Sequence, residues 1–184
     1  MPPFSLGITG GIAEGKTTVL RMLAELGYST ASADEAAKEA LEDELTQRQV
    51  AEVACLKDGF SRQALADAIA SSAEVRRRVN STLHTEVLAR LLETRAQVIE
   101  APLLVESCIQ SMFKRVWVVR CGLEEQRKRL LDRLGDSGRA QALLSLQLPA
   151  SVKSCFADHI VRTDRPLAAV LKQVEELAVK NLRF

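Results

Sequence analysis

The sequence contains no long apolar run and no excess of charge of either sign. None of its apolar stretches approaches the roughly 18–20 residues that a membrane-spanning helix needs. The opening residues, MPPFSLGITGG, lack the basic start and long apolar segment of a secretory signal. The formal net charge is +1 over 184 residues, which gives no general electrostatic reason to bind nucleic acid or an anionic membrane. An anion that this protein binds must therefore be held by a local site.

Metal-binding and disulfide patterns are also missing. The cysteines are scattered, no Cys-x-x-Cys pair occurs, and we find no metal-ligand pattern with the histidines. We expect each cysteine to be a reduced, partly buried thiol. We also expect the protein to be cytoplasmic and to need no obligate protein partner. The cysteines are Cys55, Cys108, Cys121 and Cys155.

Hydrophobic residues make up 47% of the sequence, enough for a sizeable core. Short apolar runs alternate with amphipathic stretches, a pattern typical of a parallel sheet flanked by helices in an α/β fold. The run Phe4–Ile8 predicts the first strand, and Thr17–Leu26 predicts the helix that follows it. Further strands are expected at Tyr28–Ala31, Gln97–Ala101, Val116–Arg120 and 159–161, with a terminal helix from about Pro166.

A long stretch between the second and third expected strands, residues 34–96, contains no convincing strand. Its second half carries apolar residues at four-residue steps, which indicates one face of a long helix. A helical insertion that leaves the carboxyl end of a strand is well placed to bind a second substrate. The residues of this face are Val75, Val79, Leu83, Val87 and Leu91.

Residues 123–157 are also expected to be helical, and they are rich in arginine. The sequence Gly-Asp-Ser-Gly at 135–138 interrupts them. A segment divided by glycines in this way suits a hinged lid. The remaining residues, 1–33, 97–122 and 158–184, are expected to form a nucleotide-binding core.

The segment Gly10–Thr17, GGIAEGKT, fits the phosphate-loop pattern G-x-x-x-x-G-K-[ST]. Glycines let the backbone aim successive N–H groups into a nest around a β-phosphate, and the next helix adds its positive N-terminal end. Lys16 would reach the β- and γ-phosphates of ATP, and the Thr17 hydroxyl would bind Mg²⁺. A chance match occurs in about one chain in a hundred or two of this length, but here the pattern also follows a strand and opens a helix. The predicted ATP-binding residues are Gly10, Gly11, Ile12, Ala13, Glu14, Gly15, Lys16, Thr17 and Thr18.

A phosphate loop alone does not separate kinases from motors or GTP-driven switches. The guanine-reading N-K-x-D element of the switches is absent. Motor-type ATPases usually have a second strand that ends in an acidic residue, and Glu100 matches that feature only in part. The small size, the helical insertion and the arginine-rich segment favour a small-molecule kinase.

Several segments resemble dephospho-CoA kinases. They keep their order over nearly the whole chain. The loop occurs in many kinases, but its combination with an aspartate after the second strand, Leu-His at 83–84 and PLL-x-E is much more specific to that family. The resemblance implies a P-loop NTPase fold and Mg²⁺-assisted transfer of phosphate from ATP to the ribose 3′-hydroxyl of dephospho-CoA, the last step of coenzyme A synthesis. The segments are LGITGGIAEGKTT, SAD at 32–34, APLLVE at 101–106, QRKRLLDR at 126–133, SLQLP and FADHIV.

The resemblance also implies roles for charged residues. Asp34 matches the catalytic aspartate, which can orient the attacking hydroxyl and accept its proton; the alternative role is a helix N-cap. Arg129 and Arg133 match lid arginines that close over the ATP phosphates, and Arg139 is a further candidate. A solvated charged face is the alternative for these arginines. Lys16, Asp34 and Arg133 are the expected catalytic residues.

Acceptor contacts are expected from the insertion and from the segment after the third strand. Arg62 and His84 match family positions, and Arg77 lies on the same helical stripe as His84. A structural role is the alternative for His84. The residues expected near the acceptor are Asp34, Arg62, Arg77, His84, Pro102, Leu103, Leu104 and Glu106.

Three positions depart from the family pattern. Ser32 replaces an aspartate, Thr85 replaces a proline, and Thr163 replaces an asparagine, which puts an adenine contact there in question. Two other functions therefore stay open. One is a different P-loop kinase, for a nucleotide, gluconate or shikimate, and the other is a non-catalytic nucleotide-binding relative.

Overall fold

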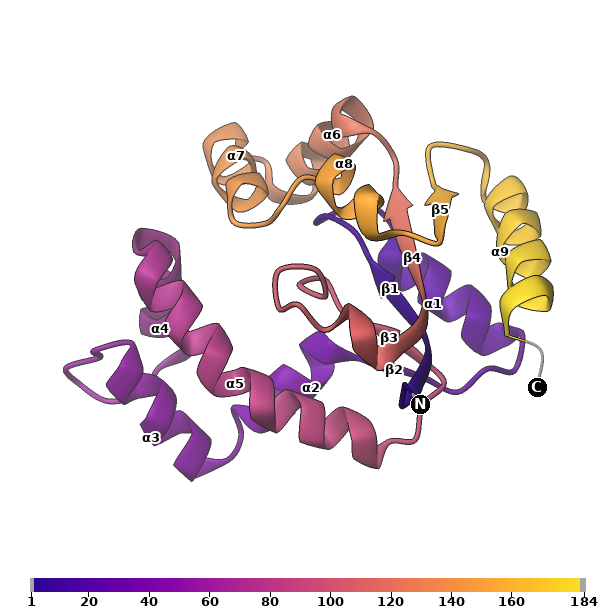
Figure 1. Ribbon diagram of the computed structural model, residues 1–184. Helices are drawn as coiled ribbons and strands as arrows, with labels where there is room; N and C mark the ends of the chain where they lie inside the picture. The colour runs from indigo at the N-terminus through magenta and orange to yellow at the C-terminus, as the bar shows by residue number, and fades with distance from the viewer. Residues whose placement is uncertain (1, 183–184) are drawn as a thin grey trace. The chain divides into compact units, whose positions relative to one another are not determined.

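A five-stranded parallel sheet forms the centre of the larger part of the molecule (Figure 1). The computed structural model describes residues 2–182. The strand order is β2-β3-β1-β4-β5, so the sequence correctly predicted five parallel strands. The strands are β1 (Phe4–Thr9), β2 (Thr30–Ser32), β3 (Val98–Glu100), β4 (Phe113–Arg120) and β5 (His159–Arg162).

The second strand begins later than the sequence predicted. Tyr28 was expected to start it, but the Tyr28 N–H instead donates to the carbonyl of Leu23 and closes the end of α1 (Lys16–Glu25). The strand proper runs parallel to β3, with Ser32 opposite Glu100. The carboxyl ends of β2 and β3 therefore meet at one edge of the sheet, which is the edge where α/β proteins bind ligands.

The main core lies between the sheet and two helices, α1 and α9 (Leu167–Asn181). Leu6 and Ile8 of β1 have no exposed surface, as expected for a parallel strand that is covered on both faces. They join Trp117 of β4 and Val174 of α9 in one cluster. This packing fixes the central strand, whose carboxyl end leads into the phosphate loop.

Residues 33–94 form a second compact unit with a core of its own. The predicted long helix is present as α5, and Val79 and Leu91 on its apolar face are buried. Three shorter helices each contact α5. The helices of this unit are α2 (Ala33–Ala40), α3 (Glu44–Val53), α4 (Arg62–Ser71) and α5 (Ala73–Glu93).

The arginine-rich segment folds into three helices that belong to the larger unit. Gly135 ends the first of them with a φ of 68°, a left-handed conformation that suits glycine. The Asp136 side chain then caps the next helix by accepting from the Arg139 N–H at 3.0 Å. The helices are α6 (Leu123–Leu134), α7 (Ser137–Ser145) and α8 (Ala150–Lys153). A short 3₁₀ turn, Ser154–Phe156, follows α8, and another, Gln110–Met112, precedes β4.

The four cysteines are free thiols. Only Cys121 is buried, so the expected partial burial is wrong for the three exposed cysteines. Between residues 2 and 182, no helix combines the length and the apolar composition that crossing a membrane requires.

Candidate active site

The loop after β1 takes up the backbone conformation that a phosphate nest needs. Gly10 has a φ of 150°, and a Cβ placed there would lie 2.3 Å from the Val119 carbonyl oxygen, so only glycine fits. Gly15 has a φ of 89° and immediately precedes α1. The predicted order of strand, glycine loop and helix is therefore confirmed, and the positive end of α1 faces the loop.

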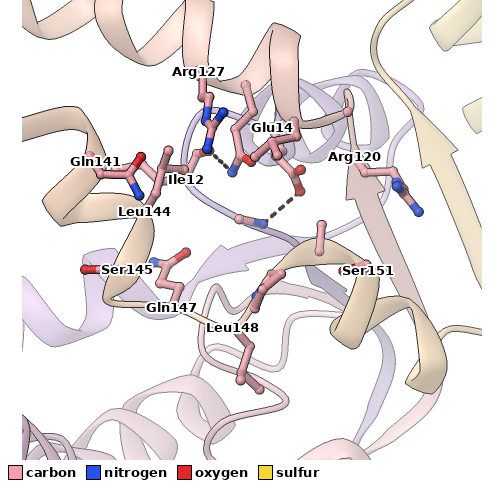
Figure 2. A pocket seen from close by; sticks show the side chains of 16 residues that line it. Ile12, Glu14, Arg120, Arg127, Gln141, Leu144, Ser145, Gln147, Leu148 and Ser151 are labelled. Carbon is pink, nitrogen blue, oxygen red and sulfur yellow. Dashed lines mark hydrogen bonds between the residues drawn. The ribbon is translucent and has the colours of Figure 1, made fainter. Parts of the chain in front are cut away.

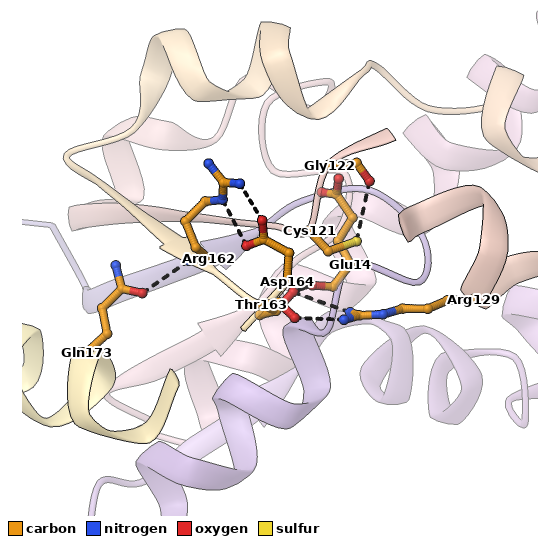
Figure 3. Close-up of polar contacts among 8 residues, drawn as sticks. All are labelled: Glu14, Cys121, Gly122, Arg129, Arg162, Thr163, Asp164 and Gln173. Carbon is orange, nitrogen blue, oxygen red and sulfur yellow. Dashed lines mark hydrogen bonds and ion pairs between the residues drawn. The ribbon is translucent and has the colours of Figure 1, made fainter. Parts of the chain in front are cut away.

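Side chains from distant parts of the larger unit hold this loop, and Figure 3 shows one of them, Thr163. Gln126 of α6 donates from Nε2 to the Ile12 carbonyl at 2.8 Å. The Thr163 hydroxyl, just after β5, donates to the Glu14 carbonyl at 2.7 Å. A Cβ at Gly11 would lie 2.5 Å from Gln126 Nε2, so a larger residue there would displace the end of the Gln126 side chain. Sequence reasoning did not identify Gln126.

Glu14 is buried inside the loop that it belongs to, with 2% of its surface exposed. Its carboxylate accepts from the Gly11 N–H at 2.9 Å. Burial raises the pKa of Glu14 above its usual value, while the hydrogen bond from Gly11 and the charges of Lys16 and Arg120 oppose that rise. The side chain therefore fixes the backbone of the loop at Gly11, and it also forms part of the wall of a cavity beside the loop.

Two polar side chains meet where β3 ends and α1 begins. The Thr17 hydroxyl lies 3.2 Å from one Glu100 carboxylate oxygen and 3.3 Å from the other. Hydroxyl and carboxylate oxygens are ligands that Mg²⁺ accepts, and nucleotide phosphates and water can supply the others. Thr17 and Glu100 therefore fit a nucleotide-bound Mg²⁺. Across residues 2–182 no group of three His, Cys, Asp or Glu side chains could hold a metal alone.

Lys16 is the first residue of α1 and is 8% exposed. Its ammonium donates to the Gly11 carbonyl at 2.9 Å, so it lies across the loop. The positive charge of Lys16 therefore lies near Gly11, at the opposite end of the phosphate loop from Gly15. A nucleotide whose phosphates occupy the nest would therefore point its terminal phosphate toward Gly11.

Of the three predicted lid arginines, Arg129 lies beside the Gly15 end of the loop, whereas Arg133 and Arg139 line neither cavity that flanks it. Arg129 donates to the Thr163 carbonyl at 2.7 Å and pairs with Glu125 at 2.8 Å. Arg133 and Arg139 are exposed. Arg127, which the sequence analysis did not single out, lines the cavity beside Gly11 and Ile12. Helical spacing alone could not decide which arginine faces the loop.

Cavities flank the loop on two sides. The larger, of about 320 Å³, is enclosed by Gly11 and Ile12, by α6, and by the chain from α7 to α8 (Figure 2). Another, of about 220 Å³, is bounded by Gly15 and Thr18 together with Arg129 and residues that follow β5. The two ends of the loop therefore open into different spaces.

The segment after β3 is tied into the larger unit. The Pro102 carbonyl accepts from the Thr9 hydroxyl at 3.2 Å and from the ammonium of Lys153, a fully buried residue of α8. Glu106 lies 2.9 Å from the same ammonium, and it accepts from the Leu148 N–H at 2.9 Å. Leu104 has no exposed surface, whereas Leu103 is half-buried. Glu106 is thus already engaged by Lys153.

The remaining candidates belong to the unit of residues 33–94. Asp34 is exposed in the first turn of α2, which begins at Ala33, so it lies inside the helix rather than at its N-cap. Arg62 opens α4 and is exposed. On α5, Arg77 is exposed, and His84 is half-buried. The His84 Nε2 is buried and has no hydrogen-bond partner among residues 2–182.

The strand order, the phosphate loop after the central strand and the Thr17–Glu100 pair define a P-loop nucleotide-binding protein. Comparison with known proteins narrows this class. The sequence profile described as "Dephospho-CoA kinase" matches residues 4–168. The chain therefore belongs to the dephospho-CoA kinase family.

Individual relatives agree with this assignment. A dephospho-CoA kinase of Synechococcus sp. (strain CC9605) is 34% identical over 193 residues, covering 95% of this chain and 93% of the relative. A Thermus thermophilus protein of known crystal structure superposes with a TM-score of 0.84 at 26% identity, with both chains covered completely. Dephospho-CoA kinase from Campylobacter jejuni shares the fold, with a TM-score of 0.59 at 22% identity and 96% of each chain covered.

Proposed function

We propose that this protein transfers the γ-phosphoryl group of ATP to the ribose 3′-hydroxyl of dephospho-CoA, giving coenzyme A and ADP. The observation that carries the proposal is a complete phosphate loop, with Thr17 against Glu100, in a chain of the dephospho-CoA kinase family. We propose that the reaction takes place in the cytoplasm. The two substrates are the only partners it requires.

The donor nucleotide is assigned to the loop and to the smaller cavity. Its phosphates accept from the N–H groups of the nest, and Lys16 neutralises charge toward the γ-phosphate. The adenine occupies the space beside Gly15 and Thr18, where the Arg129 guanidinium offers a planar cation. Arg129 is held there by Thr163, so Thr163 contributes by orienting Arg129 even though the family asparagine is absent.

Mg²⁺ is assigned to Thr17 and Glu100. When bound, the ion neutralises charge on the phosphates. The chain's own contribution is to hold a hydroxyl and a carboxylate 3.2 Å apart at the end of β3, which fixes the position of the phosphates relative to the sheet. Asp34, at the beginning of α2, is assigned to orient the acceptor hydroxyl and to accept its proton late in the transfer.

The proposal is tested by ADP release from Mg-ATP with purified protein. Dephospho-CoA is offered beside gluconate, shikimate and nucleoside monophosphates. We expect turnover with dephospho-CoA to exceed that with every other acceptor. Absence of turnover dependent on dephospho-CoA overturns the proposal, and faster turnover with another acceptor reassigns the substrate.

The role of Asp34 is tested in the same assay. Asp34→Asn is expected to lower kcat by about 10²–10⁴-fold, because general base catalysis contributes on that order, while ATP binding persists. Glu35→Gln is the matched control, since Glu35 is the neighbouring exposed acid in the first turn of α2. A near-normal kcat for Asp34→Asn removes Asp34 from the mechanism.

A further inference from the structure

The larger cavity beside the phosphate loop is lined mainly by neutral side chains. Its walls carry side-chain amides, Gln141 and Gln147, and hydroxyls, Ser145 and Ser151, among apolar side chains such as Ile12. In Figure 2 the two amides are directed into the cavity from α7 and from the chain that follows it. The lining therefore offers many neutral hydrogen-bonding groups.

The charges at this cavity do not suit a second phosphate. Arg127 faces it from α6, but the Glu14 carboxyl group lies on the same cavity. Arg120 contributes to the wall, although Figure 2 shows its guanidinium directed away from the centre. One cation opposite one carboxyl group gives little net attraction for an anion. A neutral ligand that combines methylene groups with amides matches this lining better.

One amide has no partner of its own. Gln147 Oε1 is buried and accepts no hydrogen bond from residues 2–182. A buried polar atom without a partner costs roughly 1–3 kcal/mol, so such an atom in a cavity indicates a ligand group that donates to it. A secondary amide N–H is a donor of the required kind.

The wall that carries Gln147 is held in place by buried contacts. The next residue, Leu148, donates its N–H to Glu106 at 2.9 Å. Glu106 is in turn paired at 2.9 Å with Lys153, which has no exposed surface. Gln147 is therefore presented on an anchored backbone, and a ligand that binds it does not have to order that backbone first.

The position of the cavity indicates which substrate it serves. The smaller cavity at the Gly15 and Thr18 end of the loop accounts for the donor nucleoside. The larger cavity opens at the Gly11 end, toward which the Lys16 ammonium is directed. Since the terminal phosphate of ATP points to that end, the ligand of the larger cavity lies on the acceptor side of the reaction.

We propose that the larger cavity binds the amide-containing arm of the acceptor, with Gln147 Oε1 accepting from an amide N–H of the arm and Gln141 donating to an amide carbonyl. Dephospho-CoA carries such an arm, the pantetheine chain, which contains two secondary amides. This inference rests on the proposed function. It places the residues that recognise the arm in the chain from α7 to α8 of the larger unit. Asp34 of the insertion keeps its proposed role at the acceptor hydroxyl.

The test compares Gln147→Leu and Gln141→Ala with the parent protein in steady-state kinetics. We expect KM for dephospho-CoA to rise about three- to tenfold in each variant, which corresponds to the loss of one neutral hydrogen bond, while KM for ATP stays the same. Gln110→Leu is the matched control, because Gln110 lies in a 3₁₀ turn and does not line this cavity. Unchanged KM values for dephospho-CoA in both cavity variants overturn the inference.

A second measurement uses the parent enzyme and tests the arm apart from the nucleotide. Pantetheine, which lacks the nucleotide, should inhibit the parent enzyme competitively with dephospho-CoA and not with ATP, and Gln147→Leu should weaken that inhibition. Inhibition that competes with ATP, or none at millimolar pantetheine, overturns the inference even when dephospho-CoA is a substrate. If dephospho-CoA is not phosphorylated at all, the proposed function itself is wrong, so the two failures are distinguishable.

Discussion

At the scale of single residues, Glu14 is the most unusual group at the site, because it is a buried carboxyl group inside an anion-binding loop. Burial raises its pKa, so the folded protein keeps the proton to a higher pH than the unfolded chain does. The stabilising effect of this group is therefore fully present below the ordinary carboxyl pKa and is lost as the pH rises through the folded-state pKa. Above the ordinary carboxyl pKa, the folded protein is therefore less stable than it would be with a side chain at this position that does not ionise.

Glu14→Gln tests this pH dependence of stability, because the amide oxygen can still accept from the Gly11 N–H but the side chain cannot ionise. We expect the variant to melt a few degrees higher than the parent at pH 8, since ~1 kcal/mol shifts Tm by about 2–4 °C at this chain size. The difference should shrink as the pH is lowered toward 4. Thermal melts between pH 4 and 8 measure it, with Glu39→Gln, an exposed position on α2, as control. A Tm difference that does not change with pH contradicts the prediction.

Arg127 is the α6 arginine on the larger of the two cavities beside the phosphate loop, and its role is testable against Arg133 of the same helix. We expect Arg127→Ala to lower kcat by roughly 10²–10³-fold, because a charge aimed at the transferring group stabilises the transition state. Arg133→Ala should stay close to the parent, since Arg133 lines neither cavity beside the loop. Steady-state kinetics with saturating Mg-ATP decide between them. A larger loss in Arg133→Ala would restore the assignment made from sequence.

At the scale of elements, the pair of Lys153 and Glu106 joins α8 to the segment after β3. Removing one partner of a buried ion pair leaves the other charge without compensation and typically costs about 3–5 kcal/mol. We therefore expect Lys153→Met to lower the free energy of unfolding by that amount in urea titrations. Arg21→Met is the control, because its pair with Glu25 is exposed at 3.9 Å and contributes about 0–1 kcal/mol. Equal losses in the two variants would mean that the buried pair contributes no more than the exposed one.

The elements that the sequence predicted well are those with a local signature. Alternation of apolar runs and helical stretches located the five strands, and four-residue steps located α5. The glycine pattern located the phosphate loop because its backbone conformation depends on residues within eight positions. The start of β2 was misplaced, since Tyr28 closes α1 instead of pairing with β3.

Contacts between distant elements could not be predicted in this way. Gln126 holds a carbonyl 114 positions away, and Lys153 holds one 51 positions away. Nothing in the sequence around these residues separates them from other polar residues on a helix. The same limit explains why Arg133 was chosen over Arg127, because both are charged residues of one helix and only the packing of α6 against the loop distinguishes them.

At the scale of the whole molecule, the chain divides into two compact units with separate cores. The loop, the Thr17–Glu100 pair and both cavities that flank the loop belong to the larger unit. Asp34 and the predicted insertion contacts Arg62 and His84 belong to the other. The proposed donor contacts therefore lie in the larger unit, whereas the proposed acceptor contacts lie in both units. A ligand is expected to stabilise the unit that holds its contacts.

Hydrogen exchange followed by mass spectrometry can test this division. At 100 times its dissociation constant, Mg-ATP stabilises the state that binds it by about 2.7 kcal/mol, so exchange in β1, the phosphate loop and α1 should slow by up to about a hundredfold. Helices α3 to α5 should change little with Mg-ATP alone and should slow when dephospho-CoA is added. Lys16→Ala is the control, because it removes the ammonium that is proposed to bind the phosphates and should abolish protection by ATP. If Mg-ATP alone protects α3 to α5 as strongly as α1, the donor site extends into the second unit and the assignment of that unit to the acceptor is wrong.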